Sequence, residues 1–416
     1  MKKIAILFCA FLALGSAAYA QHDTKAEVMA DIERAGGVHY LYPMNQPAPA
    51  SAPKGYKPFY VSHVGRHGAR FALGSTVYED ILDVWTKGHE KGWLTPEGEK
   101  IFQAYTRLYP SISRREGVLT LKGQGQHRYI ASQIYKNFPE VFKGKTHASA
   151  VSTESHRVIV SMFSFLSELD NLDRDFTFDA HYGQPFQSYL LPDVIDSGAE
   201  RHGEAEVKFN HFRDEVLDLD TMLNRWFAQP DSLVSNKYKF CFDLHTMVST
   251  LDNLDDPVPA ELYGIFTPQE RYNLWRVNNY RDYQLCAGSP DTQNLRMKAL
   301  RGLLDDFLVK ADEDMASGAV QLRLRFAHDS TLMPLLSLMN VNGMGAVIAD
   351  PYEVDKYWQS YNIPMACNFQ LVFFKSKKNP DILVQPFLNG FQAHFPFPEA
   401  SPGFYKWEDF KAFYRQ

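Results

Sequence analysis

Three segments of this chain share one local pattern: a short apolar or β-branched run, then a tight polar turn, then a helical pattern. The runs are Phe59–Val64, Thr146–Val151 and Gln321–Ala327. Strand–turn–helix units of this kind build parallel sheets with helices on their faces. The sequence therefore predicts an α/β fold with a mostly parallel sheet flanked by helices. Ligands are expected where the strand ends meet the helix N-termini.

The stretch between the second and third units has a different texture. Residues 171–300 are rich in helical patterns that mix aromatic and charged residues. They predict an inserted helical cap, which leaves 59–170 and 301–416 as the α/β core. Near the C-terminus, Phe369–Phe374 and Ile382–Phe387 are apolar runs separated by the turn-like KSKKNPD. This pattern predicts a β-hairpin at the sheet edge.

The N-terminus predicts export. Two lysines precede an apolar stretch from Ile4 to Leu14, and Ala18-Tyr19-Ala20 forms a small-x-small cleavage site. Residues 1–20 are therefore expected to be a signal peptide that is cleaved near Ala20, which implies a periplasmic or secreted protein. No later run reaches the roughly 20 apolar residues of a membrane helix. Residues 21–58, which end in a Pro- and Ala-rich stretch, are expected to form an extended N-terminal segment.

Composition narrows the function classes. The chain has 43 Lys and Arg against 49 Asp and Glu, a net charge of −6. This balance gives no overall basic surface of the kind that binds nucleic acid. Any anion-binding site must therefore be formed by a local cluster of basic residues. No HExxH, paired CxxC or acidic metal loop is present, so neither a metal nor another cofactor is expected. After cleavage, Cys241, Cys286 and Cys367 remain, and they allow at most one disulfide.

The first turn carries the most informative cluster, Gly65-Arg66-His67-Gly68-Ala69-Arg70. Arg66 and Arg70 are four residues apart, so both guanidinium groups can surround one anion, and such groups match phosphate oxygens. A neutral His67 between them is a nucleophile for phosphorus. A basic surface turn is the alternative. A second copy, Arg201-His202-Gly203, lacks a preceding strand and is assigned to a solvated loop of the cap.

The other two turns add compatible groups. His328 and Asp329 follow the third strand, and phosphoryl transfer needs a donor to the phosphate and an acid for the leaving group. Asp329 could instead only cap the helix that follows. Arg157 lies in the first turn of the helix after the second strand, where it either binds an anion or pairs with Glu154. Residue types that suit phosphate chemistry are less probable by chance at three strand ends than at one.

These residues resemble the histidine phosphatase superfamily, in its acid phosphatase and phytase branch. The segment 66–70 matches the RHGxR signature, 328–329 the later His-Asp pair, and 119–126 the LTxxGxxQ segment. The resemblance implies that His67 forms a phosphohistidine and that Asp329 is the proton donor. It also implies that the phosphate is bound by four further residues: Arg66, Arg70, Arg157 and His328.

The SHVGRHGARF context is similar to the multiple inositol polyphosphate phosphatases, which commonly carry His-Ala-Glu where this chain has His328-Asp329-Ser330. We therefore expect an exported, metal-independent phosphomonoesterase with an acidic pH optimum. Inositol phosphates are one substrate class, and sugar phosphates or a general acid phosphatase role are alternatives. A non-catalytic binder of phosphorylated ligands is a further alternative, and the oligomeric state stays open. Candidate extra cations for inositol hexakisphosphate are Arg201, Lys208, His211 and Arg213.

Overall fold

The computed structural model describes residues 21–74, 76–193 and 203–415. Across these residues, eight strands form one sheet. The strands are β1 (Tyr56–Arg66), β2 (Thr146–Ser152), β3 (Phe176–Tyr182), β4 (Leu322–Ala327), β5 (Asn368–Ser376), β6 (Leu383–Leu388), β7 (Phe391–Gln392) and β8 (Tyr405–Lys406). All three strands predicted from the repeated pattern are confirmed, and β1 begins three residues earlier than expected.

The sheet has a parallel half and an antiparallel half. Its order is β3-β2-β4-β1-β5-β6-β7, and β8 pairs with β6. The pairs β3–β2, β2–β4 and β4–β1 are parallel, whereas β5 and the strands beyond it are antiparallel. The predicted α/β class and the C-terminal hairpin are confirmed. The hairpin does not lie at the edge, because β5 pairs directly with β1 and β6 carries two further strands.

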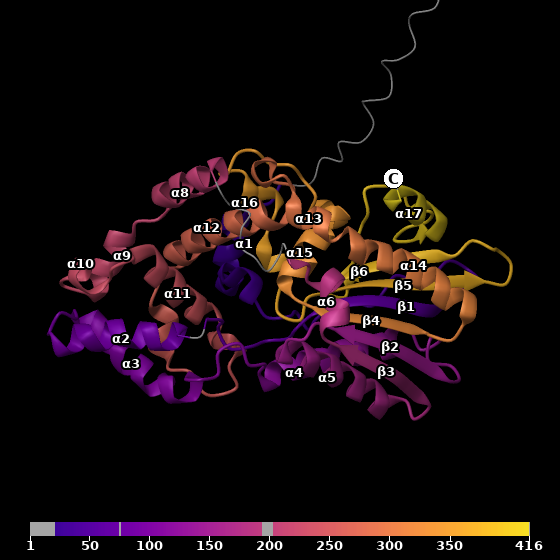
Figure 1. The fold of residues 1–416 in the computed structure, drawn as a ribbon, viewed down its shortest axis with the longest axis horizontal. Helices are drawn as coiled ribbons and strands as arrows, with labels where there is room; N and C mark the ends of the chain where they lie inside the picture. Colours follow the sequence, from indigo (N-terminus) through magenta and orange to yellow (C-terminus); the bar gives the residue numbers. More distant parts are fainter. Residues whose placement is uncertain (1–20, 75, 194–202, 416) are drawn as a thin grey trace, which may run out of the picture.

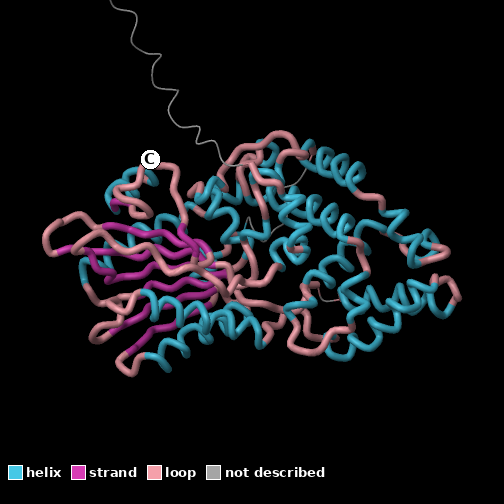
Figure 2. Tube along the Cα trace, turned by 180° about the vertical axis from the view of Figure 1, so that it is seen from behind, coloured by secondary structure: helices cyan, strands magenta, loops and turns pink. Residues whose placement is uncertain are grey.

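Helices cover both faces of the sheet (Figures 1 and 2). One face packs against α4 (Leu121–Asn137) and α5 (His156–Leu172), and the other against α6 (Gln184–Leu190) and α14 (Arg301–Ser317). Helix α15 (Asp329–Leu338) leaves the end of β4, and α17 (Trp407–Tyr414) closes the C-terminus. The strands β1, β2 and β4 lie between these helix layers and are largely buried, which fits the apolar and small residues at most of their positions.

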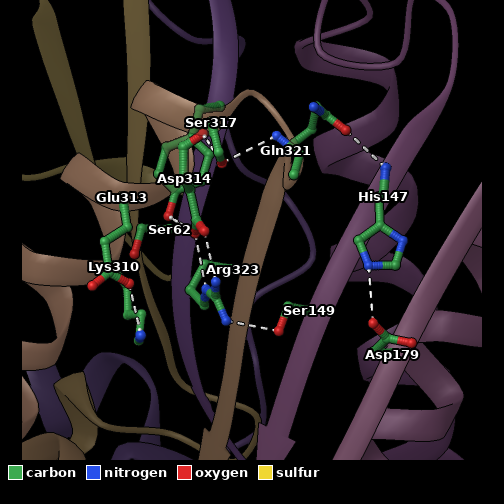
Figure 3. A network of polar contacts seen from close by, with 12 residues as sticks. Ser62, His147, Ser149, Asp179, Lys310, Glu313, Asp314, Ser317, Gln321 and Arg323 are labelled. Atoms are coloured by element: carbon green, nitrogen blue, oxygen red, sulfur yellow. Dashed lines mark hydrogen bonds and ion pairs between the residues drawn. The ribbon is translucent and has the colours of Figure 1, made fainter.

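Alternation along β4 fixes how α14 lies on the sheet. Leu322, Leu324 and Phe326 join the core on the α4/α5 face, so Arg323 and Arg325 project to the opposite side. Asp314 of α14 accepts two hydrogen bonds from Arg323, at 2.9 and 2.6 Å. Figure 3 shows this contact beside the Arg323–Ser149 hydrogen bond. Arg325 donates one hydrogen bond to the carboxylate of Asp306, also on α14, at 2.6 Å. Two carboxylates of one helix, α14, thus neutralise the two arginines of β4.

The cap is built from more of the chain than the predicted insertion. Its helices include α2 (Val77–Glu90), α3 (Pro96–Ile112), α8 (Glu204–Val216), α9 (Leu219–Trp226), α10 (Pro230–Leu233), α11 (Lys237–Ser249), α12 (Pro268–Cys286) and α13 (Leu295–Ala299). Helix α2 packs against α3 and α11, so residues 77–112 belong to the cap although the sequence placed them in the core. Conversely, β3 lies within the predicted insertion and pairs with β2.

The sequence predicted an extended N-terminal segment, but much of this segment is helical. It forms α1 (Thr24–Ala30) and the 3-10 helix η1 (Ile32–His39), and only the stretch before β1 is without regular structure. Burial explains the difference, because Val28 and Ala35 pack into an aromatic cluster of the cap. Thr24 also donates a 2.7 Å hydrogen bond to the buried Asp355. Tertiary contacts thereby stabilise helices too short to persist alone.

The remaining helical turns connect these layers. They are α16 (Val354–Tyr357) and the 3-10 turns η2 (Leu251–Asn253), η3 (Ala260–Gly264), η4 (Pro290–Thr292), η5 (Val341–Gly343) and η6 (Ser360–Asn362). No helix in the described ranges is long and apolar enough to cross a membrane. The predicted signal peptide and its cleavage site lie outside the described residues.

Candidate active site

The turn after β1 is held by the N-terminus of α4. Thr120 caps this helix and also donates to the Ala69 carbonyl at 3.0 Å, while Gln126 accepts from the Ala69 amide at 2.8 Å. A Cβ on Gly123 would lie 2.3 Å from the Ala69 oxygen, and one on Gly68 would lie 2.3 Å from the Gly123 oxygen. Only glycine fits at both positions. The LTxxGxxQ segment thus positions the turn.

His67 is buried and oriented by its own loop. Its Nδ1 lies 2.9 Å from the Gly68 carbonyl, and because a carbonyl only accepts, Nδ1 carries the proton. The unprotonated nitrogen is therefore Nε2. Burial lowers the pKa of His67 well below its usual value, and the charges of Arg66 and Arg70 lower it further. The side chain is consequently a neutral imidazole with one available lone pair.

The buried Arg66 of β1 forms an ion pair with Asp329 at the start of α15, whose side chain is 23% exposed. Arg66 Nη2 donates to Asp329 Oδ2 at 2.7 Å, and Nη1 donates to the Val38 carbonyl and, at 3.0 Å, to the Ile363 carbonyl. Asp329 Oδ1 also accepts from the Ser330 amide. Burial by itself would raise the pKa of Asp329, but Arg66 and Arg70 outweigh it and hold that pKa well below its usual range. Asp329 is therefore ionised here.

The other predicted phosphate ligands surround His67. Arg70 is buried, and its Nη1 donates to the Phe71 carbonyl at 2.9 Å. Burial, followed by the charge of Arg66, lowers the pKa of Arg70 to about 9. The rings of His328 and His67 are 5.8 Å apart, and His328 Nε2 lies 3.1 Å from Thr153 Oγ1. Arg157, at the start of α5, adds its charge to the field at His67.

The cluster combines cations that repel one another. The Nε atoms of Arg66, Arg70 and Arg157 are buried without a hydrogen-bond partner in the structure. Buried donors without partners are costly. A phosphoryl group supplies both negative charge and acceptor oxygens, so it would relieve both penalties. The structure brings together all of the site residues predicted from the sequence.

Two residues near this cluster carry no sequence motif. His39, the last residue of η1, lies close enough to Arg70, Arg66 and Asp329 for their charges to act on its pKa. Asp282, on α12, is buried, and the charge of Asp329 acts on it in turn. Both line a small cavity of about 20 Å³ between η1, α11 and α12, which has room for about one water molecule. Nothing in the local sequence identifies them, because they come from segments far apart in the chain.

The extra cations considered for inositol hexakisphosphate are paired elsewhere in the cap. Lys208 contacts Asp291 at 2.6 Å, His211 contacts Glu215 at 3.3 Å, and Arg213 contacts its neighbour Asp214 at 2.8 Å. Arg201 lies outside the described residues, as do the first two positions of the second Arg-His-Gly copy.

The remaining candidates for a functional role are the three cysteines with described positions and the residue types that bind metals. Cys241, Cys286 and Cys367 are buried free thiols. Among the residues with a described position, no group of three or more His, Cys, Asp or Glu side chains could hold a metal ion.

Solved structures identify the fold. The apo multiple inositol polyphosphate phosphatase of Bifidobacterium longum is 18% identical, with a TM-score of 0.74 over 91% of this chain and 97% of that one. Its complex with inositol hexasulfate gives 17% identity, a TM-score of 0.73, and coverage of 92% and 97%. The phytase from D. castellii is 15% identical, with a TM-score of 0.71 over 92% of this chain and 84% of that one. No family model and no curated protein sequence matches. The resemblance noted in the sequence is thus confirmed at the level of the fold.

Proposed function

We propose that this chain is a histidine-type acid phosphatase that hydrolyses phosphate monoesters through a phosphohistidine at His67. The observation that carries the proposal is the state of His67. It is a neutral imidazole whose Nδ1 is fixed by the Gly68 carbonyl and whose surroundings include Arg70, Arg157 and His328. A nucleophile of this kind, with cations around it, suits attack on a phosphoryl group.

The first chemical step forms an Nε2–P bond and breaks the bond between phosphorus and the ester oxygen. Arg70, Arg157 and His328 stabilise charge on the other phosphoryl oxygens, and Arg66 joins them when the ester weakens its pair with Asp329. In the second step, water attacks the phosphohistidine and Asp329 takes the proton from that water. Inorganic phosphate then leaves and His67 is restored.

Asp329 must be protonated before it can serve the leaving group. Because Arg66 and Arg70 keep its pKa low, we infer that the proton arrives with the substrate. A phosphate monoester loses its second proton with a pKa of about 6. Below that pH the ester binds as a monoanion and transfers its proton to Asp329, which returns it to the departing oxygen. Activity therefore declines as the pH rises above about 6.

Inositol phosphates are the substrate class that the fold favours. The solved structures of similar fold include a multiple inositol polyphosphate phosphatase bound to inositol hexasulfate and a phytase. We further propose export, on the basis of the N-terminal signal peptide pattern. A sugar phosphatase role uses the same reacting groups, and a release assay with inositol phosphates, sugar phosphates and nucleotides separates these substrates.

Trapping the intermediate tests the mechanism. After brief incubation with a ³²P-labelled aryl phosphate and an alkaline quench, the wild type should retain label on the protein. His67→Ala should retain none and lose at least about 10,000-fold in kcat. His211→Ala, an exposed cap variant, is the matched control and should label normally. Label on His67→Ala, or loss of wild-type activity on prolonged chelation, would contradict the proposal.

A further inference from the structure

Thr153 and His328 follow two neighbouring parallel strands and meet at their ends. Thr153 comes directly after β2, and His328 comes directly after β4. The last residue of β2, Ser152, pairs with Phe326 of β4. Thr153 Oγ1 lies 3.1 Å from His328 Nε2, and both side chains are buried. The proposed reaction uses His328 and gives this hydroxyl no part.

The hydroxyl of Thr153 is the donor in this contact. Among the described residues, His328 Nε2 is its one hydrogen-bond partner. A buried O–H group that reaches no acceptor is costly, and a ring nitrogen accepts a hydrogen bond only when it carries no proton. Because the hydroxyl proton has no other acceptor, Nε2 is the unprotonated nitrogen of His328. The proton of the neutral ring is then on Nδ1.

The Nδ1 atom of His328 is open to a ligand. Burial, followed by the charge of Arg157, lowers the pKa of His328 to about 3, so the ring is neutral and carries a single proton. Nδ1 has no hydrogen-bond partner among the described residues, yet it is not one of the enclosed polar atoms. The charge of Asp329 also acts on this ring, and the His67 ring is 5.8 Å away. The open nitrogen therefore lies at the phosphate cluster.

The tautomer decides whether His328 attracts or repels a phosphoryl group. An N–H at the open nitrogen donates to a phosphoryl oxygen, whereas a lone pair at that nitrogen would face the lone pairs of the oxygen. In a neutral imidazole, the nitrogen that carries the proton is set by the hydrogen bond that the other nitrogen makes. The Thr153 hydroxyl makes that bond.

We propose that Thr153 is a positioning residue of the phosphatase, whose hydroxyl fixes His328 as the Nδ1-protonated tautomer that donates to the phosphoryl group. The inference rests on the proposed phosphatase function. Its own backbone holds Thr153 in place, because the amide donates to the Phe326 carbonyl at 3.3 Å and the carbonyl accepts from the Ser152 hydroxyl at 3.0 Å. Since every ester carries the same phosphoryl group, loss of the hydroxyl affects all esters alike.

Nitrogen NMR of the wild type with ¹⁵N-labelled histidine tests the tautomer directly. The His328 signals are identified by their disappearance in His328→Gln. Nε2 should have the chemical shift of an unprotonated ring nitrogen, and Nδ1 that of a protonated one. This measurement needs no substrate, so it does not depend on the phosphatase function. A protonated Nε2 in the wild type would overturn the proposal.

A matched set of variants tests the consequence for catalysis. Thr153→Val removes the hydroxyl but keeps the shape of the side chain, and its kcat/KM should fall roughly 10- to 100-fold, the size of a lost hydrogen bond to a charged group. The loss should be equal on 4-nitrophenyl phosphate and glycerol 2-phosphate, and the inhibition constant of inorganic phosphate should rise by a similar factor. Thr153→Ser should recover most of the activity. Thr146→Val makes the same change at the other end of β2, where the hydroxyl donates to the Val141 carbonyl, and should leave the kinetics unchanged.

A double-mutant cycle separates a role through His328 from a general loss of structure. In a His328→Ala background, Thr153→Val should cause no further fall in kcat/KM, because the ring that the hydroxyl orients is gone. If the two losses multiply, or if Thr153→Ser is as slow as Thr153→Val, the proposal is wrong. If Thr153→Val does not fold, the NMR measurement on the wild type decides. Failure of the wild type to hydrolyse 4-nitrophenyl phosphate would instead reject the phosphatase function itself.

Discussion

The two halves of the candidate site are built in different ways. The core half, which includes His67, Arg70 and His328, sits on turns at the ends of parallel strands. His67 and Arg70 contact backbone carbonyls of their own loop, and His328 contacts the Thr153 hydroxyl. The cap half, with His39 and Asp282, comes from a 3-10 turn and the side of a long helix. The core half concentrates positive charge, whereas the cap half pairs its charges internally.

Under the proposed function, the reacting groups all belong to the core half. Strand ends hold nucleophile and cations in a fixed relation, because the sheet on one side and α4 on the other leave no space for adjustment. The cap half contacts this arrangement through the hydrogen bond from Arg66 to the Val38 carbonyl. Changes in the core half should therefore affect every substrate, and changes in the cap half should affect substrates differently.

The largest effect after loss of the nucleophile is expected for the acid. Asp329→Asn should lower kcat on glycerol 2-phosphate by roughly 100- to 10,000-fold, because the alkoxide then leaves without a proton. The loss on 4-nitrophenyl phosphate should be smaller, since that leaving group is a much weaker base. Steady-state kinetics on the two esters measures the contrast. Equal losses on both would remove Asp329 from the acid role.

The next largest effect is expected at the tight contact between the turn after β1 and helix α4. Gly123→Ala places a methyl group against the Ala69 carbonyl and should cost roughly 1–3 kcal/mol of unfolding free energy, with lower kcat on every ester. Gly125→Ala is the matched control on the same helix, since its Cβ meets nothing within 4 Å. It should stabilise by about 0.5–1 kcal/mol. Urea unfolding distinguishes the two, and similar values would refute a tight contact.

Acid should destabilise the core half through its buried histidines. His63 and His127 pack against Phe326, and burial lowers the pKa of each to about 3 from an ordinary 6.5. Between these values the unfolded chain binds protons that the folded chain does not, so stability present above pH 6.5 is lost as the pH falls towards 3.

Replacing one of these histidines measures that loss. In His63→Phe, the slope of unfolding free energy against pH should decrease by up to about 1.4 kcal/mol per pH unit, which corresponds to one proton. Urea unfolding at several pH values between 4 and 7 provides the slope. An unchanged slope would mean that His63 is already protonated in the folded protein.

The smallest effect is expected on the outer cap. Lys208 is paired with Asp291, so Lys208→Gln should change kcat/KM by less than about twofold on both 4-nitrophenyl phosphate and inositol hexakisphosphate. A loss above about tenfold, confined to the hexakisphosphate, would place Lys208 in the substrate pocket.

The sequence was informative wherever an element is defined locally. The runs at Phe59–Val64 and Thr146–Val151 predicted strands because each is a short apolar or β-branched run that a polar turn follows. The clustering of Arg66, Arg157 and Asp329 followed from one rule, that ends of parallel strands meet at one edge. The sequence placed residues 77–112 in the core because a helical pattern identifies a helix but not its packing partner.

The chain alone thus predicted which side chains would lie together at the strand ends, because glycines, strand ends and helix starts fix the position of a side chain within a few residues. Only the tertiary structure decided the ionisation of Asp329 by Arg66 and the meeting of His39 with Asp282. Both depend on distances between residues more than 200 positions apart in the chain, and electrostatic energy varies with the distance in space. No local pattern records that distance.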